Sequence, residues 1–407
     1  MSNCLIYRTL GYPFFNQRDL LEYRQKIKII NLIIRKFNNG QSGDFMSKIY
    51  SIWFHEIGLP EVIKKELVAC FQSFESIYKA SQEEYMCKGW QGEIVQRIKK
   101  SPLFTDVLEE RIKRYESNQV KLVDYLDEGY PEYLRYIPDS PMLLYIKGND
   151  QLLNTPTIGI VGSRNCSEYG YSVTVQLAQE LAGGGITVIS GMAMGVDAAA
   201  HYGALKSGMT IAVLGNGLNI CYPACNQRIY EEILSKGCII SEYDLDHEPR
   251  PYQFPKRNRI ISGMSMCVVV TEANIRSGSL ITAQLALDYG RDVCAIPGNI
   301  TRKLSLGTNE LIKKGAKCVT GVEDVIEELP FDLRIKYEEI KKNKTKKHYE
   351  LAQEERIVYA YVSQEPIFLN ELVNSTQLSY KSIYKGLLQL EIKGLIKRLP
   401  GERYVRV

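Results

Sequence analysis

Seven short runs of apolar residues recur at near-even spacing through the middle of the chain, and this spacing constrains the fold more than any other feature. The runs are rich in Val and Ile and begin near Ile158, Ile186, Ile211, Ile239, Cys267, Val293 and Ala316. Successive starts lie about 23 to 28 residues apart, the length that a strand, a turn, a helix and a return require. Continuous apolar runs are typical of strands buried on both faces. The spacing therefore predicts an α/β fold: a doubly wound, mostly parallel sheet with helices on both sides.

Loops of small, polar and cationic residues connect these runs. The first run leads into Gly162-Ser163-Arg164, and the second into a loop from Ser190 to Asp197. The segment Phe254-Pro255-Lys256-Arg257-Asn258-Arg259 precedes the fifth run. Ligands of such sheets bind where strands end and helices begin, because helix N-termini present unpaired N–H groups there. The loops therefore predict a binding site for a long, phosphorylated ligand.

The turn Gly162-Ser163-Arg164 stands where a dinucleotide-binding fingerprint would stand but does not match it. The Gly-x-Gly-x-x-Gly pattern is absent, and the second run ends in Ser190 rather than in an acidic ribose ligand. The sequence contains no Walker loop either. These patterns argue against NAD, FAD and ATP hydrolysis, and we expect no cofactor. The turn is therefore either a phosphate-binding loop with one cation or a purely structural turn.

The loop after the second run contains two glycines, Gly191 and Gly195, that can serve either of two purposes. Because they lack a Cβ, they let a ligand approach the backbone. They equally let the following helix pack closely on the sheet. Asp197, at the start of that helix, is expected to cap the helix or brace the loop rather than to act as a catalytic base.

The segment 256–259 is the sharpest local signal, with three cations in four residues beside Phe254. Cations contact phosphates, and an aromatic ring can stack on a base. We expect a helix to start near Arg257 and four cations to line one groove whose floor is the backbone of Gly191 and Gly195. These cations are Arg164, Lys256, Arg257 and Arg259. The alternative is a solvated cationic turn.

Composition describes an ordinary soluble chain. The net charge is only +4 with 24% charged residues, so a polyanion would have to be held by local patches. The ten cysteines are scattered and the four histidines lie far apart, so no zinc-binding spacing exists. No signal-peptide pattern is evident, and the longest apolar stretch, Ile27 to Ile34, is too short to span a bilayer. We therefore expect a cytoplasmic protein with reduced thiols and no membrane contact.

Breaks in composition divide the chain into five parts. These are a helical extension at 1–48, short helical patterns at 49–118, the sheet domain at 119–330, a flexible lysine-rich linker at 331–350 and a final unit at 351–407. The short helices either present backbone N–H groups to DNA phosphates or form a packing module. The linker is either a solvated tether or a contact to the DNA backbone.

The final unit, 351–407, has the pattern of a winged helix: three helices followed by a hairpin around Pro400-Gly401. Ser379 is expected to cap the third helix and Gly394 to end it. From Lys381 to Val407, seven Lys or Arg stand against two Glu, which favours a surface that faces nucleic acid. Winged helices also contact proteins, so the sequence leaves both partners open.

Seven groups of residues in the sheet domain recur together in one known family. They are Gly162-Ser163-Arg164 with Tyr169-Gly170, Ser190 to Asp197 with His201, Tyr222-Pro223 with Asn226, Ser241-Glu242-Tyr243, Phe254-Pro255 with Arg257 to Gly263, Ser277-Gly278-Ser279 with Thr282-Ala283, and Pro297-Gly298. With these motifs the chain resembles the DNA processing protein A family (DprA/Smf). It departs from the family in the extension before about residue 48, and in Ala224-Cys225, which leaves the loop after Tyr222-Pro223 without a cation.

The resemblance implies a helical N-terminal domain, an extended Rossmann domain and a C-terminal winged helix. It further implies a homodimer that binds single-stranded DNA, protects incoming DNA during natural transformation and loads the RecA recombinase. No catalytic residue is implied. Carried onto this sequence, the DNA-binding positions are Gly162, Ser163, Arg164, Ser190, Gly191, Gly195, Asn226, Phe254, Lys256, Arg257, Asn258 and Arg259.

Two other functions fit parts of the pattern. Nucleoside-monophosphate phosphoribohydrolases have a similar fold and a Pro-Gly-Gly-x-Gly-Thr-x-x-Glu signature. This chain has Ser277 to Thr282 at that place without the matching Glu, so the hydrolytic carboxylate is missing and we do not expect an enzyme. A winged-helix regulator with a nucleotide-sensing domain is the other alternative, and it would require sequence-specific binding of duplex DNA.

Overall fold

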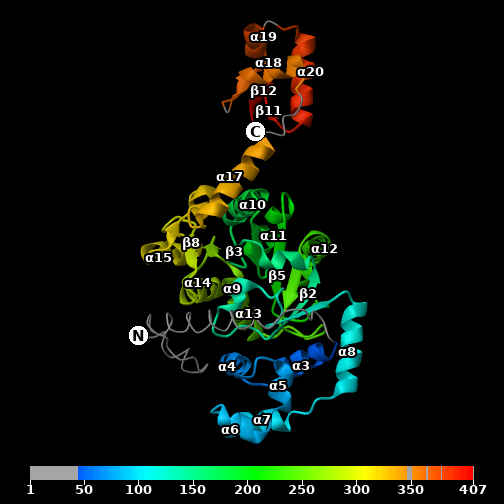
Figure 1. Cartoon of the computed structure of the whole chain (residues 1–407). Helices are drawn as coiled ribbons and strands as arrows, with labels where there is room; N and C mark the ends of the chain where they lie inside the picture. The colour runs from blue at the N-terminus through cyan, green and yellow to red at the C-terminus, as the bar shows by residue number, and fades with distance from the viewer. Residues whose placement is uncertain (1–44, 346–350, 364, 377, 407) are drawn as a thin grey trace. The chain divides into compact units, whose positions relative to one another are not determined.

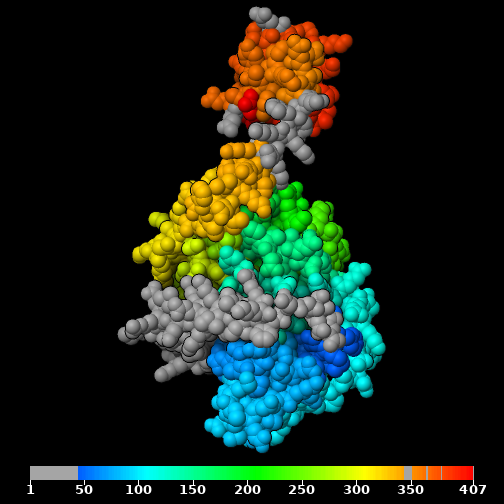
Figure 2. All heavy atoms as spheres, in the orientation of Figure 1, coloured from blue at the N-terminus to red at the C-terminus, as the bar shows by residue number. Residues whose placement is uncertain are grey.

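The structure, a computed structural model, describes residues 45–345, 351–363, 365–376 and 378–406. The chain divides into two compact units, Met1–Glu338 and Glu339–Val407 (Figures 1 and 2). Most of the predicted N-terminal extension, residues 1–44, lies outside the described residues. Its last four residues, 45–48, begin helix α3.

The first unit begins with a segment of short helices, residues 45–117, that we call the helical segment. Its helices are α3 (Phe45–Glu56), α4 (Glu61–Phe71), α5 (Phe74–Lys79), α6 (Gln82–Cys87), α7 (Glu93–Lys100) and α8 (Thr105–Ser117). Ser81 and Glu84 form a reciprocal capping box that starts α6, as the spacing of a serine and a glutamate three residues later favours. The helices enclose aromatic side chains, among them Trp53 and Tyr78, whose rings meet edge to face at 5.1 Å.

A nine-stranded sheet forms the body of the first unit. Its strands are β1 (Lys121–Asp124), β2 (Leu143–Gly148), β3 (Thr157–Val161), β4 (Thr187–Ser190), β5 (Thr210–Leu214), β6 (Cys238–Ser241), β7 (Cys267–Val270), β8 (Asp292–Ala295) and β9 (Lys317–Cys318). Their order is β1-β2-β6-β5-β4-β3-β7-β8-β9. The seven strands from β6 to β9 in this order run parallel, and each coincides with one of the seven predicted apolar runs. The predicted doubly wound sheet is confirmed.

Helices cover both faces of the sheet (Figure 1). The helical elements of this part are α9 (Glu132–Arg135), η1 (Asp150–Asn154), α10 (Glu168–Gly183), α11 (Val196–Leu205), η2 (Ala224–Asn226), α12 (Gln227–Lys236), α13 (Gln253–Met264), α14 (Gly278–Asp288), η3 (Lys303–Ser305), α15 (Leu306–Lys313), α16 (Val322–Ile326) and α17 (Phe331–Thr345). Helix α11 contacts α10 and α12, whereas α13 contacts α14. Alternate residues of β7 enter separate cores: Cys267 and Val269 join one, and Val268 and Val270 join the other. The strands are therefore buried on both faces, as their continuous apolar runs predict.

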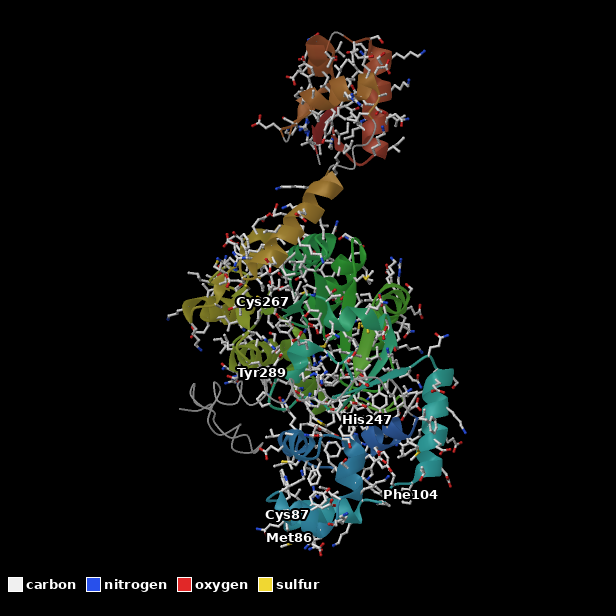
Figure 3. The ribbon with its side chains drawn as sticks, viewed as in Figure 1. Met86, Cys87, Phe104, His247, Cys267 and Tyr289 are labelled. Atoms are coloured by element: carbon white, nitrogen blue, oxygen red, sulfur yellow. The ribbon has the colours of Figure 1, made fainter. Side chains whose placement is uncertain are left out.

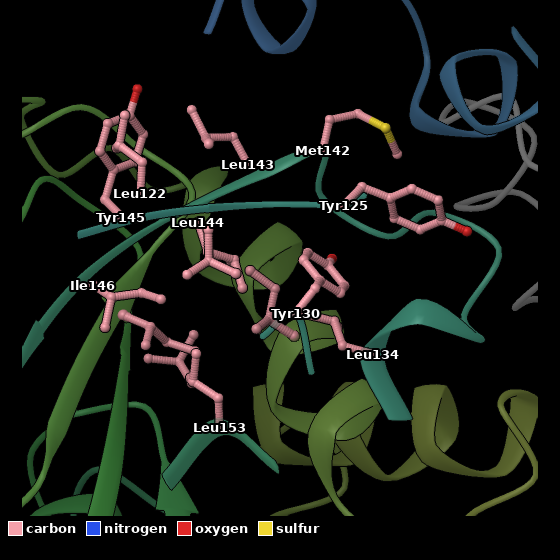
Figure 4. Packing of buried hydrophobic residues seen from close by; sticks show 14 of the residues in the cluster. Leu122, Tyr125, Tyr130, Leu134, Met142, Leu143, Leu144, Tyr145, Ile146 and Leu153 are labelled. Atoms are coloured by element: carbon pink, nitrogen blue, oxygen red, sulfur yellow. The ribbon is translucent and has the colours of Figure 1, made fainter. Parts of the chain in front are cut away.

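Strands β1 and β2 extend the sheet at the β6 edge in antiparallel order. Successive side chains of β2 point to opposite sides in Figure 4: Leu143 and Tyr145 toward the helical segment, and Leu144 and Ile146 away from it. The sequence predicts β2 as an added strand but does not predict β1, which pairs with it.

The helical segment packs on the sheet through a shared apolar core, in which the rings of Tyr115 and Tyr145 lie 5.4 Å apart, and through several polar contacts. His55 Nε2 donates to the backbone carbonyl of Glu242 at 2.9 Å, and Arg111 bridges Glu56 and Asp244. The loop that follows Glu242 continues to His247, which Figure 3 places where the helical segment meets the sheet. Of the two interpretations of this segment, packing is therefore the one seen in the structure.

The predicted flexible linker is wrong over most of its length, because residues 331–345 form helix α17. Its side chain Tyr337 is buried and lies so close to Gly184 that a Cβ there would overlap the ring. The high lysine content of this segment predicted a flexible chain and gave no indication that Tyr337 would anchor it. The boundary between the two units falls inside α17, after Glu338. Residues 346–350 lie outside the described residues.

The second unit is a winged helix with its own apolar core. Its elements are α18 (Gln353–Tyr361), β10 (Ile367–Phe368), α19 (Leu369–Thr376), α20 (Tyr380–Ile392), β11 (Ile396–Leu399) and β12 (Arg403–Arg406). The strands pair antiparallel in the order β10-β12-β11. The Ser379 hydroxyl accepts the Ser382 amide at 3.2 Å and caps α20, as predicted.

Candidate nucleic-acid interface

The site lies at the carboxyl edge of the sheet, near the point where the strand order reverses. Strands β3 and β7 are neighbours, and the chain leaves them for helices on opposite faces. Crevices of this kind hold the ligands of doubly wound folds. The loops after the two strands are tied together here, because the Ser163 amide donates to the backbone carbonyl of Glu272 at 2.7 Å.

A carboxylate of the chain itself occupies the start of α10. Glu272, which is buried, accepts the Ser167 amide at 2.8 Å and the Ser167 hydroxyl at 2.6 Å. Gly170 lies so close to this carboxylate that a Cβ there would overlap it. Two donors at this helix start, the amide and the hydroxyl of Ser167, are therefore already engaged and are not free to hold a pyrophosphate.

The predicted groove of four cations is wrong, because two of the four are interior. Arg257 is only 4% exposed, and its guanidinium donates to the carbonyls of Gly191 and Val213. Burial lowers its pKa to about 10. Arg259 is 2% exposed and pairs with Glu242. Both belong to α13, which starts at Gln253 rather than near Arg257, so that these side chains turn inward with its apolar residues.

The two loop glycines serve close packing. A Cβ on Gly191 would overlap the guanidinium of Arg257. Gly195 has φ +74°, in the left-handed region, and a Cβ there would overlap the carbonyl of Ser163. Gly162 is crowded as well, since its Cβ would lie 2.7 Å from Val196 Cγ2. The close-packing interpretation of these glycines is the one seen in the structure.

Three polar side chains brace the same loop. The Ser190 hydroxyl, which is buried, donates to the carbonyl of Ile160 at 2.6 Å. The Asn226 amide donates to the carbonyl of Met192 at 2.9 Å. Asp197 accepts the Ala193 amide at 3.3 Å, which confirms its predicted role as a brace. Ser190 and Asn226 thus hold the backbone in place and offer little surface to a ligand.

An aromatic and cationic cluster occupies the surface beside these braces. The guanidinium carbon of Arg164, which is exposed, lies 5.6 Å from the centroid of the Phe254 ring. The Tyr222 ring stacks on Phe254, with ring centroids 5.4 Å apart and an interplanar angle of 26°. Tyr222 is 44% exposed. We call these three residues the Arg164–Phe254–Tyr222 stack.

Lys256 and Asn258 lie on α13 beside this stack. The Lys256 side chain is half-exposed, and its Nζ lies 2.8 Å from Glu242 Oε1. Burial alone would raise the pKa of Glu242, but the charges of Arg259 and Lys256 hold it at about 2. Asn258 is half-buried and accepts a hydrogen bond from Arg257 Nε at 3.2 Å. Of the predicted cations, Arg164 and Lys256 are therefore the two that can reach a ligand.

Three further cations at this edge were not predicted. Arg276 follows β7, while Arg302 and Lys303 follow β8, and all three are exposed. Their loops are joined by a hydrogen bond from the Ala273 amide to the carbonyl of Leu304 at 2.7 Å. Tyr222, which belongs to the Tyr222-Pro223 motif of the sequence, is not among the predicted site residues. Its neighbour Pro223, which turns the chain, was the available signal.

Two kinds of feature are absent from the described ranges. No three His, Cys, Asp or Glu side chains gather closely enough to hold a metal ion. No helix in these ranges combines the length and the apolar character needed to cross a membrane.

The fold and the site define an extended Rossmann protein with an aromatic and cationic surface at its carboxyl edge and a winged helix at its C-terminus. The sequence matches the family of DNA recombination-mediator protein A over residues 121–330, and the DprA winged helix domain over residues 342–402. The chain belongs to this DprA/Smf family.

Relatives extend the similarity over most of the chain. Protein Smf of Synechocystis is 33% identical over 87% of this chain and 97% of its own length. DNA processing protein DprA of Streptococcus pneumoniae is 46% identical over 51% of this chain and 73% of its own length. The X-ray structure of DNA processing protein A from S. pneumoniae covers 70% of this chain and 98% of its own, with 36% identity and a TM-score of 0.61.

Proposed function

We propose that this protein binds single-stranded DNA at the Arg164–Phe254–Tyr222 stack and thereby processes DNA for recombination. The observation that carries the proposal is the stack itself, in which an exposed cation, an exposed ring and a half-buried ring lie together at the surface. Unpaired bases stack on aromatic rings, while guanidinium groups contact the phosphates between them. A duplex keeps its bases stacked internally, so the surface favours single strands. Membership of the DprA/Smf family supports the same substrate.

The electrostatic part of binding falls to few residues. Arg164 is exposed and Lys256 half-exposed, whereas Arg257 and Arg259 are committed to the interior. Each phosphate neutralised on a single strand contributes a slope of about −0.7 to log K against log salt. The sheet edge beyond Arg164 carries Arg276 and Arg302, so a long strand would meet further cations there.

The cellular role that we propose follows from the family. The protein protects incoming DNA during natural transformation and loads the RecA recombinase on it, acting as a homodimer in the cytoplasm and without catalysis. The absence of catalysis is supported by the segment 277–282, where the Ser277 hydroxyl accepts the Ser279 amide at 3.3 Å and caps α14. The first acidic residue of α14 is Asp288, at its end, so that no carboxylate stands in the place of the hydrolytic Glu.

Competition binding tests this proposal. A labelled single strand of mixed sequence is bound to the protein and displaced by unlabelled single strands, by duplexes and by nucleoside monophosphates. We expect efficient displacement by the single strand alone. Equal displacement by duplex DNA would contradict the proposal, and release of free base from the monophosphates would favour a phosphoribohydrolase instead.

A further inference from the structure

The third helix of the winged helix, α20, carries a row of exposed apolar side chains along its outer face. Tyr380, Tyr384, Leu388 and Ile392 follow one another at intervals of four residues and are 50%, 42%, 56% and 69% exposed. Residues at this spacing form one ridge on a helix. The opposite face of α20 is separate, because Ile383, Leu387 and Leu390 are buried in the core of the unit. We call the exposed row the α20 ridge.

The two tyrosines of the α20 ridge are held in place by their hydroxyl groups. Tyr380 donates to Asn370 Oδ1 at 2.6 Å, and Tyr384 donates to Glu402 Oε1 at 2.9 Å. Their polar ends are therefore engaged within the unit, and the rings add apolar surface to Leu388 and Ile392. A ridge of two fixed rings and two aliphatic side chains loses little side-chain entropy when it is covered.

The composition of the α20 ridge disfavours DNA as its partner. In winged helices that read duplex DNA, the third helix enters the major groove and offers hydrogen-bonding groups to base edges. Leu388 and Ile392 can offer only contacts to thymine methyl groups. Contiguous apolar side chains on a protein surface instead mark contacts with other proteins.

Charge beside the α20 ridge indicates the chemistry of the partner. Lys381 and Lys385 lie on one flank of the ridge, and the Lys385 side chain is 73% exposed, with Glu354 3.7 Å away. Two copies of α20 packed antiparallel would bring these lysines together, and like charges at an interface are unfavourable. A helix of another protein with carboxylates beside its apolar row would match both the apolar ridge and the lysines on its flank. Ridges spaced by four residues are those that pack helix against helix.

We propose that the α20 ridge is a docking surface for an amphipathic, acid-flanked helix of a partner protein. The apolar row of that helix covers Tyr384, Leu388 and Ile392, and its carboxylates pair with Lys381 and Lys385. In this arrangement the winged helix recruits a protein, while the sheet domain holds DNA.

Site-specific photo-crosslinking in the full chain tests the proposal. A benzophenone amino acid is placed at position 388 and, as a control, at position 361, where Tyr361 is exposed on α18 outside the ridge. Both proteins are produced in the natural host and irradiated, and the crosslinked peptides are sequenced. We expect position 388, but not 361, to capture a helical peptide with apolar residues at intervals of three or four and acidic residues beside them. The double substitution Lys381→Glu with Lys385→Glu should reduce the yield of this crosslinked peptide by at least ~10-fold, because it places carboxylates opposite the carboxylates of the partner.

Any other crosslinking pattern overturns the proposal. Capture of a second copy of this chain, of its own sheet domain or of nucleic acid would identify a different occupant. Equal capture at both positions, or none at either, would show that the ridge has no dedicated partner. Circular dichroism and thermal unfolding of each variant verify that the exposed substitutions leave the fold intact.

Discussion

The guanidinium carbon of Arg164 lies 5.6 Å from the centroid of Phe254, although the two residues are ninety positions apart in the chain. Arg164 follows β3, and Phe254 stands in the first turn of α13. Their contact joins the turn after β3 to a helix that precedes β7, the neighbour of β3 in the sheet. A base could stack on Phe254 while its phosphate contacts Arg164. Substituting one of the two residues at a time therefore separates the stacking part of the binding free energy from the electrostatic part.

Arg164→Ala and Phe254→Leu should therefore weaken single-strand binding in different ways. Loss of Arg164 should reduce affinity and flatten the slope of log K against log salt by about 0.7, because one phosphate contact is lost. Loss of the Phe254 ring should reduce affinity by about 1–3 kcal/mol with an almost unchanged slope, because stacking depends little on salt. Fluorescence anisotropy across a salt series measures both. Lys113→Ala, an exposed cation on α8, is the control and should behave as the wild type.

Arg257 should matter for stability rather than for salt dependence. Arg257→Met leaves the carbonyls of Gly191 and Val213 without their buried donor, and we expect a loss of about 3 kcal/mol in the free energy of unfolding. Arg164→Ala, at the surface, should change it by no more than about 0.5 kcal/mol. Urea denaturation compares the two. An Arg257→Met protein of wild-type stability with a flattened salt slope would mean that Arg257 turns outward to hold a phosphate.

His201 should make the sheet domain sensitive to acid. It is fully buried, with Nδ1 2.7 Å from Thr210 Oγ1, and burial lowers its pKa from 6.5 to about 3. Because the folded-state pKa is depressed, the unfolded chain binds the proton first. This contribution to stability is present above pH 6.5 and is lost as the pH falls toward 3. Relative to His201→Gln, the wild type should lose about 1.4 kcal/mol per pH unit below 6.5.

Urea denaturation at pH 7 and 5.5 gives this difference. Imidazole resonances of the wild type provide a second measurement, and the His201 signal should stay that of a neutral ring at pH 5. A His201 signal that titrates near pH 6.5 would contradict the prediction.

Removal of the winged helix should leave most single-strand affinity intact. Residues 1–338 contain the whole Arg164–Phe254–Tyr222 stack and form a compact unit, and the second unit has a separate core. We expect a protein that ends after Glu338 to bind a single strand within about threefold of the full chain, a difference below 1 kcal/mol. A folded truncation that no longer binds would place the principal DNA contact in the winged helix.

The strands could be predicted from sequence because each is a local signal. The runs that begin near Ile158, Ile211 and Ile239 need no distant partner to be recognised, and the regular spacing supplies the topology. The same holds for Ser379, whose hydroxyl caps the next helix within three residues. Such features depend on neighbours in the chain, which the sequence displays directly.

The burial of Arg257 and Arg259 could not be predicted, because it depends on partners far away in the sequence. Arginine is mostly exposed unless it is paired, and the partners are the carbonyl of Gly191 and the carboxylate of Glu242. Helix α13 also starts at Gln253 rather than near Arg257, since proline, here Pro255, is tolerated in the first turn of a helix. Placing that start at Gln253 turns both arginines inward.

The carboxylate of Glu272 at the start of α10 has a consequence for the protein in a cell full of small phosphate compounds. By accepting the amide and hydroxyl of Ser167, it shields this end of the helix from free mononucleotides, whose phosphates would otherwise be drawn to it. A polymer that can also offer bases to Tyr222 and Phe254 is not subject to this exclusion. We therefore expect free mononucleotides to compete poorly with a single strand for this surface.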